Sequence, residues 1–173
     1  MNLFVTDTDP AICAMNLDDK RVGKLLMECN QMMSLALKTH WEDNSYVFWE
    51  TRDELTSGWS HLNHPVSIWV RESIGNYEWT LAHAKALAQE WEFRFGSSHG
   101  SARRLTFLER EYPLRIPRGA LSPFQNSARN SQIDFTHLPV PYSYRHYLHN
   151  RWQTDKLPVK FTGRQEPAWR HIL

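Results

Sequence analysis

Two long stretches of the chain repeat apolar residues with the spacing of an amphipathic helix. The first runs from about Asp18 to about His40, and the second from Ser73 to Phe95. Apolar side chains recur three and four residues apart, which places them on one helical face. These faces consist of Val22, Leu25, Leu26, Cys29, Met32, Met33, Ala36 and Leu37 in the first stretch, and of Ile74, Tyr77, Leu81, Ala84, Ala88, Trp91 and Phe95 in the second. The pattern predicts two long helices packed together.

Residues at the ends of these stretches favour the same assignment. Asp18 and Asp19 suit a helix N-terminus, where the helix dipole stabilises acidic groups. Ser73 is the expected N-cap of the second helix, and Gly96 the left-handed residue that ends it. A shorter helix is expected from Pro65 to Glu72, because proline is favoured at the first helical position.

The rest of the chain is predicted to hold shorter helices and long connections. Asp9 and Pro10 should begin a helix of one or two turns, and further helices are expected over residues 98–112 and 142–156. Residues 41–58 are expected to form an irregular loop or a short hairpin, and the proline-rich residues 114–141 a long connection.

The predicted fold class is therefore all-α, a single-domain helical bundle over residues 1–173 with long irregular loops. Residues 1–16 are expected to form an N-terminal arm, whose first residues are either a short strand or an extended segment. Residues 157–173 are expected to form a basic C-terminal tail.

Composition is that of a globular protein with a large core. The chain has 173 residues, of which 41% are hydrophobic and eight are Trp. Most of the Trp rings are expected in the core, with stacking surfaces for bases as the alternative. The two cysteines, Cys13 and Cys29, form neither a metal-binding spacing nor a disulfide framework, and no signal peptide or membrane-spanning run is evident. We therefore expect a cytoplasmic protein.

Charge is distributed unevenly along the chain. Residues 1–100 hold 8 Lys and Arg against 14 Asp and Glu, whereas residues 101–173 hold 12 against 5. The basic second half either faces a polyanion or is attracted to the acidic first half. Six arginines between residues 103 and 129 suit contacts with phosphates of nucleic acid.

Polar residues on the two long helices are the main candidates for chemistry. Lys20, Lys24 and Glu28 lie opposite the apolar face of the first helix, either as functional groups or as a solvated row. The second helix carries a polar line in which His83 and Glu90 could act as an acid–base pair. A buried hydrogen-bonded network is the alternative explanation of that line.

We expect these residues to line one pocket between the two helices. The expected lining is Lys20, Lys24, Glu28, His64, Arg71, Asn76, His83, Glu90 and Arg94. The candidate catalytic residues are Lys20, Lys24, Glu28, His83 and Glu90. The candidate substrate-binding residues are His64, Arg71, Asn76, Trp79, Arg94, His99, Arg103 and Arg104. Two histidine pairs at a spacing of three, His61 with His64 and His146 with His149, lack further ligands at zinc spacing, so neither a metal nor another cofactor is expected.

Three segments together carry a resemblance to a known family. They read LDDKRVGKLLMECNQMMS, NHPVSIWVRESIGNYEWTLAHAKALAQEWEFRFGSSHGS and LSPF. They resemble a small helical protein family of phages and prophages that is associated with pyrimidine-dimer DNA glycosylases. The resemblance implies a phage-encoded enzyme that extrudes a damaged or modified base from DNA and attacks its sugar carbon.

The resemblance also implies an amine nucleophile and a Schiff-base intermediate for the bifunctional members. In the phage enzymes this amine is the N-terminal one, freed by removal of Met1. Here Asn2 follows Met1, and its bulk disfavours that removal, so Lys20 or Lys24 is expected to be the amine with Glu28 as its partner. Alternatively, Glu28 or Glu90 assists a water molecule without a covalent step.

The function expected from the sequence is a DNA-acting enzyme of the base-excision or base-modification type. One alternative is a phage counter-defence protein that binds or processes nucleotides. Another is a non-catalytic nucleic-acid-binding protein. DNA is the expected partner, a nucleotide is a second option, and the sequence favours no oligomeric state.

Overall fold

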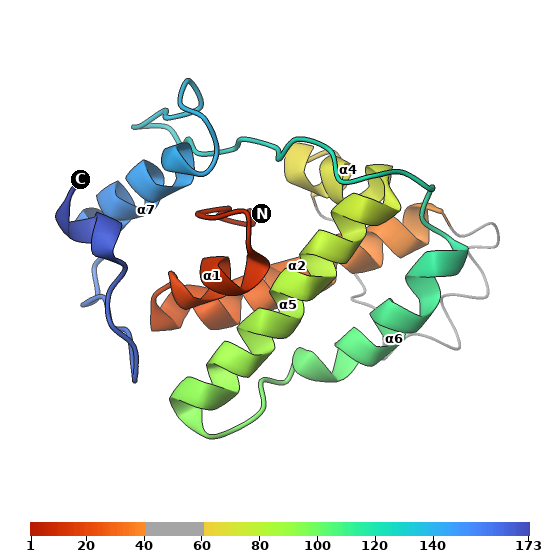
Figure 1. Cartoon of the computed structure of the whole chain (residues 1–173), viewed down its shortest axis with the longest axis horizontal. Coiled ribbons are helices and arrows are strands. Elements are labelled where there is room, and N and C mark those ends of the chain that lie inside the picture. Colours follow the sequence, from red (N-terminus) through yellow and green to blue (C-terminus); the bar gives the residue numbers. More distant parts are fainter. Residues whose placement is uncertain (41–60) are drawn as a thin grey trace.

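The structure, a computed structural model, describes residues 1–40 and 61–173. Helix α2 (Asp19–Thr39) packs along helix α5 (Ile74–Phe95), and these are the two longest helices of the described ranges (Figure 1). Helices α1 (Pro10–Met15), α4 (Pro65–Glu72) and α6 (Leu105–Glu111) also pack on α5. The predicted all-α fold class is confirmed.

The ends of these helices follow from their capping residues. The Ser73 hydroxyl accepts a hydrogen bond from the Asn76 N–H, and Gly96 ends α5 with a φ of 64°. Asp9 accepts from the Ala11 N–H, and His64 accepts from the Val66 N–H ahead of Pro65. Each cap satisfies a backbone group that a helix terminus leaves without a partner, and so fixes where the helix begins or ends.

The core lies where α2 meets α5. The Cys29 side chain is fully buried there, as the apolar pattern predicts. Trp69, Trp79 and Trp152 are 4%, 7% and 5% exposed, which confirms the core assignment for these three rings. Their indole N–H groups donate to the Pro123 carbonyl, the Thr8 carbonyl and the Asp18 carboxylate, respectively. Buried Trp is stable here because each N–H has an acceptor.

One predicted helix differs in the structure. The helix expected over residues 98–112 is shorter, because α6 is flanked by the 3-10 turns η1 (Ala102–Arg104) and η2 (Tyr112–Leu114). The Ser101 N–H donates to the His99 ring, so this serine- and glycine-rich stretch closes as a turn instead of a helix. Of the two options left open for residues 1–5, a strand or an arm, the structure shows an arm. The loop or hairpin expected over residues 41–58 lies outside the described residues.

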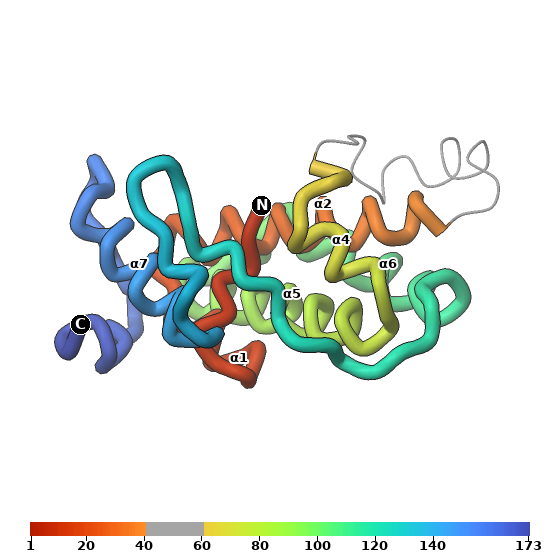
Figure 2. The backbone as a smooth tube through the Cα atoms, turned by 90° about the horizontal axis from the view of Figure 1, so that it is seen from above, coloured from red at the N-terminus to blue at the C-terminus, as the bar shows by residue number. Residues whose placement is uncertain are grey.

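The second half of the chain wraps around the α2–α5 pair. Residues 115–141 run from η2 past α4 to helix α7 (Tyr142–Thr154) (Figure 1). Helix α7 and the C-terminal turn η3 (Ala168–His171) lie together at one end of the molecule, away from α6 (Figure 2). Within the described ranges no helix has both the length and the apolarity to cross a membrane.

Gly75 tests how tightly residues 115–141 pack on the start of α5. A side chain at Gly75 would collide with the backbone of Ala120 and Leu121, neither of which can rotate away. We expect Gly75→Ala to lower the free energy of unfolding by about 2 kcal/mol, measured by urea denaturation. Gly100→Ala is the control, since no atom lies within 4 Å of its added carbon. Equal stability of the two variants would contradict this packing.

Candidate functional site

The N-terminal arm ends against a buried carboxylate of α2. The Asn2 backbone N–H donates to Glu28 Oε2 at 2.9 Å. Glu28 is 8% exposed, and Lys24 Nζ lies 3.5 Å from its other oxygen, Oε1. The Lys24 side chain itself is 59% exposed. One carboxylate therefore faces two nitrogens, one of them on a side chain open to solvent.

A strained turn holds Asn2 in place. Its side-chain oxygen accepts from the N–H groups of Leu3 and Phe4, at 2.8 and 3.2 Å. Phe4 has a φ of 46°, in the left-handed region, which costs a non-glycine residue about 1–2 kcal/mol. Its ring stacks on Tyr147 at 5.8 Å between centroids, and the Asn2 amide donates to the Ser127 carbonyl at 3.3 Å. Such strain is kept where the surroundings over-determine it, which is common at functional sites.

The arm is fixed further along by α5 and α7. Trp79 Nε1 donates to the Thr8 carbonyl at 2.9 Å, and the His83 ring lies 2.9 Å from the Pro10 carbonyl through Nδ1. Arg145 donates to the Thr6 carbonyl at 2.9 Å. Trp79 was predicted to bind substrate and His83 to act in acid–base catalysis, but both are buried beneath the arm, and His83 is fully buried. Their visible role is to position the arm.

His64 lies near enough to the Glu28 carboxylate for the two groups to interact electrostatically. Its Nδ1 accepts from the Val66 N–H at 3.2 Å, so Nε2 carries the proton of the neutral ring. Burial lowers the pKa of His64, the positive N-terminus and His61 lower it further, and Glu28 opposes them. His64 therefore offers a neutral N–H donor at pH 7. The Arg71 guanidinium donates to the Leu62 carbonyl and supports this turn.

A groove of about 480 Å³ lies between α2 and α5, next to the Glu28 site. Its walls include Lys20, Lys24, Met27, Trp91, Phe95 and His99. Lys24 joins the two places, because it lines the groove and pairs with Glu28. Three of the predicted residues, Lys20, Lys24 and His99, thus meet in one open groove between the two long helices.

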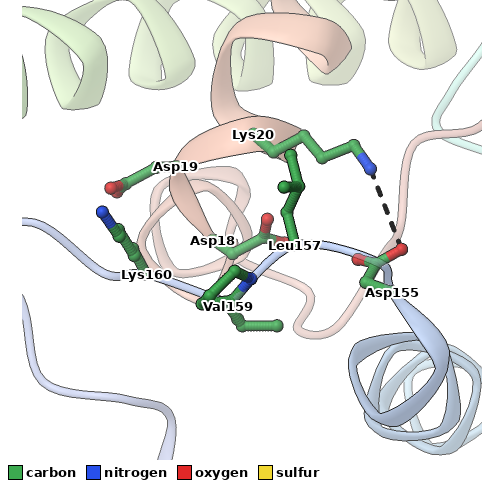
Figure 3. A pocket seen from close by; sticks show the side chains of 8 residues that line it. Asp18, Asp19, Lys20, Asp155, Leu157, Val159 and Lys160 are labelled. Atoms are coloured by element: carbon green, nitrogen blue, oxygen red, sulfur yellow. Dashed lines mark ion pairs between the residues drawn. The ribbon is translucent and has the colours of Figure 1, made fainter.

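Lys20 also borders a second, smaller hollow. Figure 3 shows its side chain extending toward Asp155 at the end of α7, with Nζ 3.8 Å from Oδ1. The hollow has a volume of about 160 Å³ and is walled partly by residues 157–160 of the tail. Asp155 also binds Arg21 at 2.8 Å, so this carboxylate fastens α7 to α2.

The predicted pair Glu90 and Arg94 forms a structural network away from Glu28. Arg94 donates to Glu90 and Asp19, at 2.8 and 3.0 Å, and Arg164 of the tail donates to both Glu90 oxygens at 2.9 Å. Burial alone would raise the pKa of Glu90, but the hydrogen bonds from Arg164 and Arg94 outweigh it and lower the pKa. Glu90 is therefore held ionised with both oxygens occupied.

The single pocket expected from the sequence does not form. Lys24, Glu28 and His64 come together, Lys20 lies one helical turn away, and His83, Glu90 and Arg94 are buried in other contacts. Asn76 is also buried, where its side chain binds the Trp69 carbonyl and Ser122. Arg103 and Arg104 lie on η1, the turn that follows His99. The polar line of α5 is thus the buried network that the sequence analysis left as the alternative.

Sequence reasoning missed two features of this region. It did not place Asn2 beside Glu28, because a contact between residues 26 positions apart leaves no periodic signal. It assigned Trp91 and Phe95 to the apolar core face, although they line the groove. Gly23, in the second turn of α2, was the available signal, since glycine inside a helix commonly marks a close approach.

A family model described as pyrimidine dimer DNA glycosylase matches residues 1–101. The chain belongs to the pyrimidine dimer DNA glycosylase family. The matched part holds the arm, α2, α4, α5 and every residue of the Glu28 site and the groove named above except Ser127, Arg145 and Tyr147. No curated protein and no solved structure matches the chain significantly.

His83 should make stability depend on pH. Burial lowers its pKa from 6.5 to about 4, so the unfolded chain binds more protons than the folded chain between these values. We expect the free energy of unfolding to fall by up to about 3 kcal/mol as the pH drops from 6.5 to 4, measured by urea denaturation. His83→Gln should flatten this dependence, and His137→Gln, at an exposed position, should keep it. Parallel curves for His83→Gln and the wild type would contradict the assignment.

Proposed function

We propose that this chain is a base-excision enzyme acting on DNA, with Glu28 as its acid–base residue. The observation that carries the proposal is the contact of one largely buried carboxylate with two nitrogens, the Asn2 N–H and the Lys24 ammonium. Membership of the pyrimidine dimer DNA glycosylase family supports DNA as the substrate. The phage origin and cytoplasmic location expected from the sequence stay predictions.

The arrangement suits attack by an amine on the sugar of a damaged nucleotide. An unprotonated amine forms a bond to C1′ while the bond from C1′ to the base breaks, and the base leaves with the electron pair. Glu28 accepts the proton that the amine loses, and it stabilises the positive charge that develops on the sugar. Opening of the sugar ring then gives a Schiff base, which borohydride reduces to a stable amine.

Two nitrogens compete for the nucleophilic role. Lys24 Nζ lies 3.5 Å from Glu28 Oε1, so this pair provides the amine and its proton acceptor on consecutive turns of α2. The Asn2 nitrogen is an amide while Met1 precedes it, but it would become an α-amine at the same position if Met1 were removed. The α-amine has a typical pKa of about 8, so a fraction of it is unprotonated at pH 7. We propose Lys24 as the nucleophile of the intact chain.

His64 fits a supporting role beside the carboxylate. Its Nε2–H is available to the oxygen or base nitrogen of a nucleotide that approaches Glu28, because Nδ1 is already occupied by Val66. His61, whose φ of 65° is the other positive value among the described non-glycine residues, precedes it in the same turn. Left-handed backbone at Phe4, in the arm that binds Glu28, and at His61, in the turn before His64, supports this place as the reacting centre.

Glu28→Gln tests the proposal directly. We expect at least a 100-fold loss of base release from duplex oligonucleotides that carry pyrimidine dimers or other modified pyrimidines, because glutamine cannot take up a proton. Strand analysis after alkali treatment measures base release. Glu109→Gln is the matched control, since this exposed carboxylate pairs with Lys85 on α5. Unchanged turnover in Glu28→Gln would contradict the proposal.

Absence of any turnover with tight DNA binding would favour the non-catalytic alternative from the sequence analysis. In that case the affinity should fall steeply with salt, and Glu28→Gln should leave it unchanged. A nucleotide that stays bound through purification would favour the nucleotide-binding alternative.

Trapping with borohydride tells the two amines apart. We expect a covalent adduct on the peptide that contains Lys24, identified by mass spectrometry, and its loss in Lys24→Gln. Lys85→Gln, a lysine of α5 paired with Glu109, is the control and should be trapped as the wild type. An adduct on Asn2 that persists in Lys24→Gln would reject Lys24 as the nucleophile and assign the role to a freed N-terminal amine.

A further inference from the structure

The groove beside Glu28 has an aromatic wall on α5. The rings of Trp91 and Phe95 lie 4.4 Å apart between centroids, and the edge of His99 meets Trp91 at 4.7 Å. Phe95 is 39% exposed, and Met27 of α2, on the facing wall, is 43% exposed. Large apolar side chains this open to water mark a binding surface when they gather in one hollow.

Gly23 makes room for this wall. A side-chain carbon on Gly23 would lie 2.5 Å from Trp91 Cζ3 and 3.0 Å from Cε3, so only glycine lets the indole lie against α2. Glycine inside a helix costs about 1 kcal/mol relative to alanine. Gly23 thus lowers the stability of α2, and it allows the Trp91 ring to lie between α2 and α5 at the groove.

Positive charge borders the same hollow. The side chains of Lys20 and Lys24 are 58% and 59% exposed, and both line the groove. The carboxylate of Asp19, which also lines it, is occupied by Arg94 and by Thr162. His99 accepts from the Ser101 N–H through Nδ1, which leaves its Nε2–H as a neutral donor close to Gly23. Lysines beside aromatic rings suit a phosphate and a flat base together.

We propose that this groove binds an unpaired base of the DNA substrate, stacked on Trp91 and Phe95, with a neighbouring phosphate on Lys20. This inference rests on the proposed function, and it adds a second site to it. Lys24 lies at the junction, so a nucleotide in the groove would be adjacent to one that reacts at Glu28. The groove would hold DNA open next to the reacting sugar and offset part of the cost of unstacking.

Binding to a bulged duplex tests the groove without any chemical step. Two duplexes are compared, one with a single extrahelical thymidine and one with a tetrahydrofuran residue there, which lacks a base and cannot form a Schiff base. Stacking of one base on an aromatic side chain changes affinity by about 5- to 100-fold. We expect the wild type to bind the base-containing bulge at least 5-fold more tightly, measured by fluorescence anisotropy.

Trp91→Leu and Phe95→Ala should remove this preference and leave binding of the base-free duplex unchanged. Phe93→Ala is the matched control, because Phe93 is 56% exposed on α5, outside the groove lining and under Arg164. Lys20→Gln should instead weaken binding of both duplexes and reduce the slope of log affinity against log salt by about 1. Thermal unfolding verifies that each variant is folded. If Trp91→Leu does not fold, Phe95→Ala still tests the groove, because Phe95 is partly exposed.

Equal weakening of both duplexes by Trp91→Leu and Phe95→Ala would overturn the proposal, because the groove would then contact only the backbone. Binding of free thymidine monophosphate as tight as that of the bulged duplex, and dependent on Trp91, would overturn it in favour of a nucleotide site. If Glu28→Gln left turnover unchanged while the wild type still preferred the base-containing bulge, the proposed enzyme would be rejected and the groove would remain a base-binding site. If Glu28→Gln abolished turnover while the wild type bound both duplexes equally well, the enzyme would be supported and the groove rejected.

Discussion

The buried Glu28 carboxylate determines the conformation of the N-terminal arm. An acidic group at 8% exposure needs partners, and Glu28 accepts a hydrogen bond from the Asn2 backbone and forms an ion pair with Lys24. Placing that backbone N–H beside Glu28 requires Phe4 to adopt a left-handed conformation. The conformational energy of Phe4 is offset by stacking of its ring on Tyr147 and by the hydrogen bond that the Asn2 side chain accepts. The start of the chain is thus part of the site's architecture.

Much of the fold could be predicted because its determinants are local. Periodic apolar residues set α2 and α5, and Ser73 and Gly96 set the ends of α5, to within a residue or so of the expected bounds. The helix expected over residues 98–112 was too long, because the side-chain cap at His99 competes with helix formation there. The spacing of apolar residues does not reveal the side-chain hydrogen bonds that polar residues at a helix end can form in place of helical ones.

The site was predictable only in part, for a physical reason. Lys24 and Glu28 are neighbours on one helix, so their pairing follows from helical geometry. Whether a polar line faces solvent, a cleft or the interior depends on what packs over it, and that is set by distant segments. The arm covers His83, and the tail supplies Arg164 to Glu90, so the histidine and carboxylate of α5 became structural. The basic second half likewise uses Arg164 and Arg145 to bind acidic residues of the first.

The tail's anchorage has a consequence for where this protein can be divided. The stretch shared with the family stops at residue 101, yet carboxylates inside it depend on partners beyond it. Asp18 accepts from Trp152, Asp19 from Thr162, and Glu90 from Arg164. A chain cut at the family boundary would keep the three acidic groups and lose those donors, leaving negative charge undercompensated at one end of the α2–α5 pair. The part of the chain that matches the family is therefore shorter than the part needed to pair its own buried carboxylates.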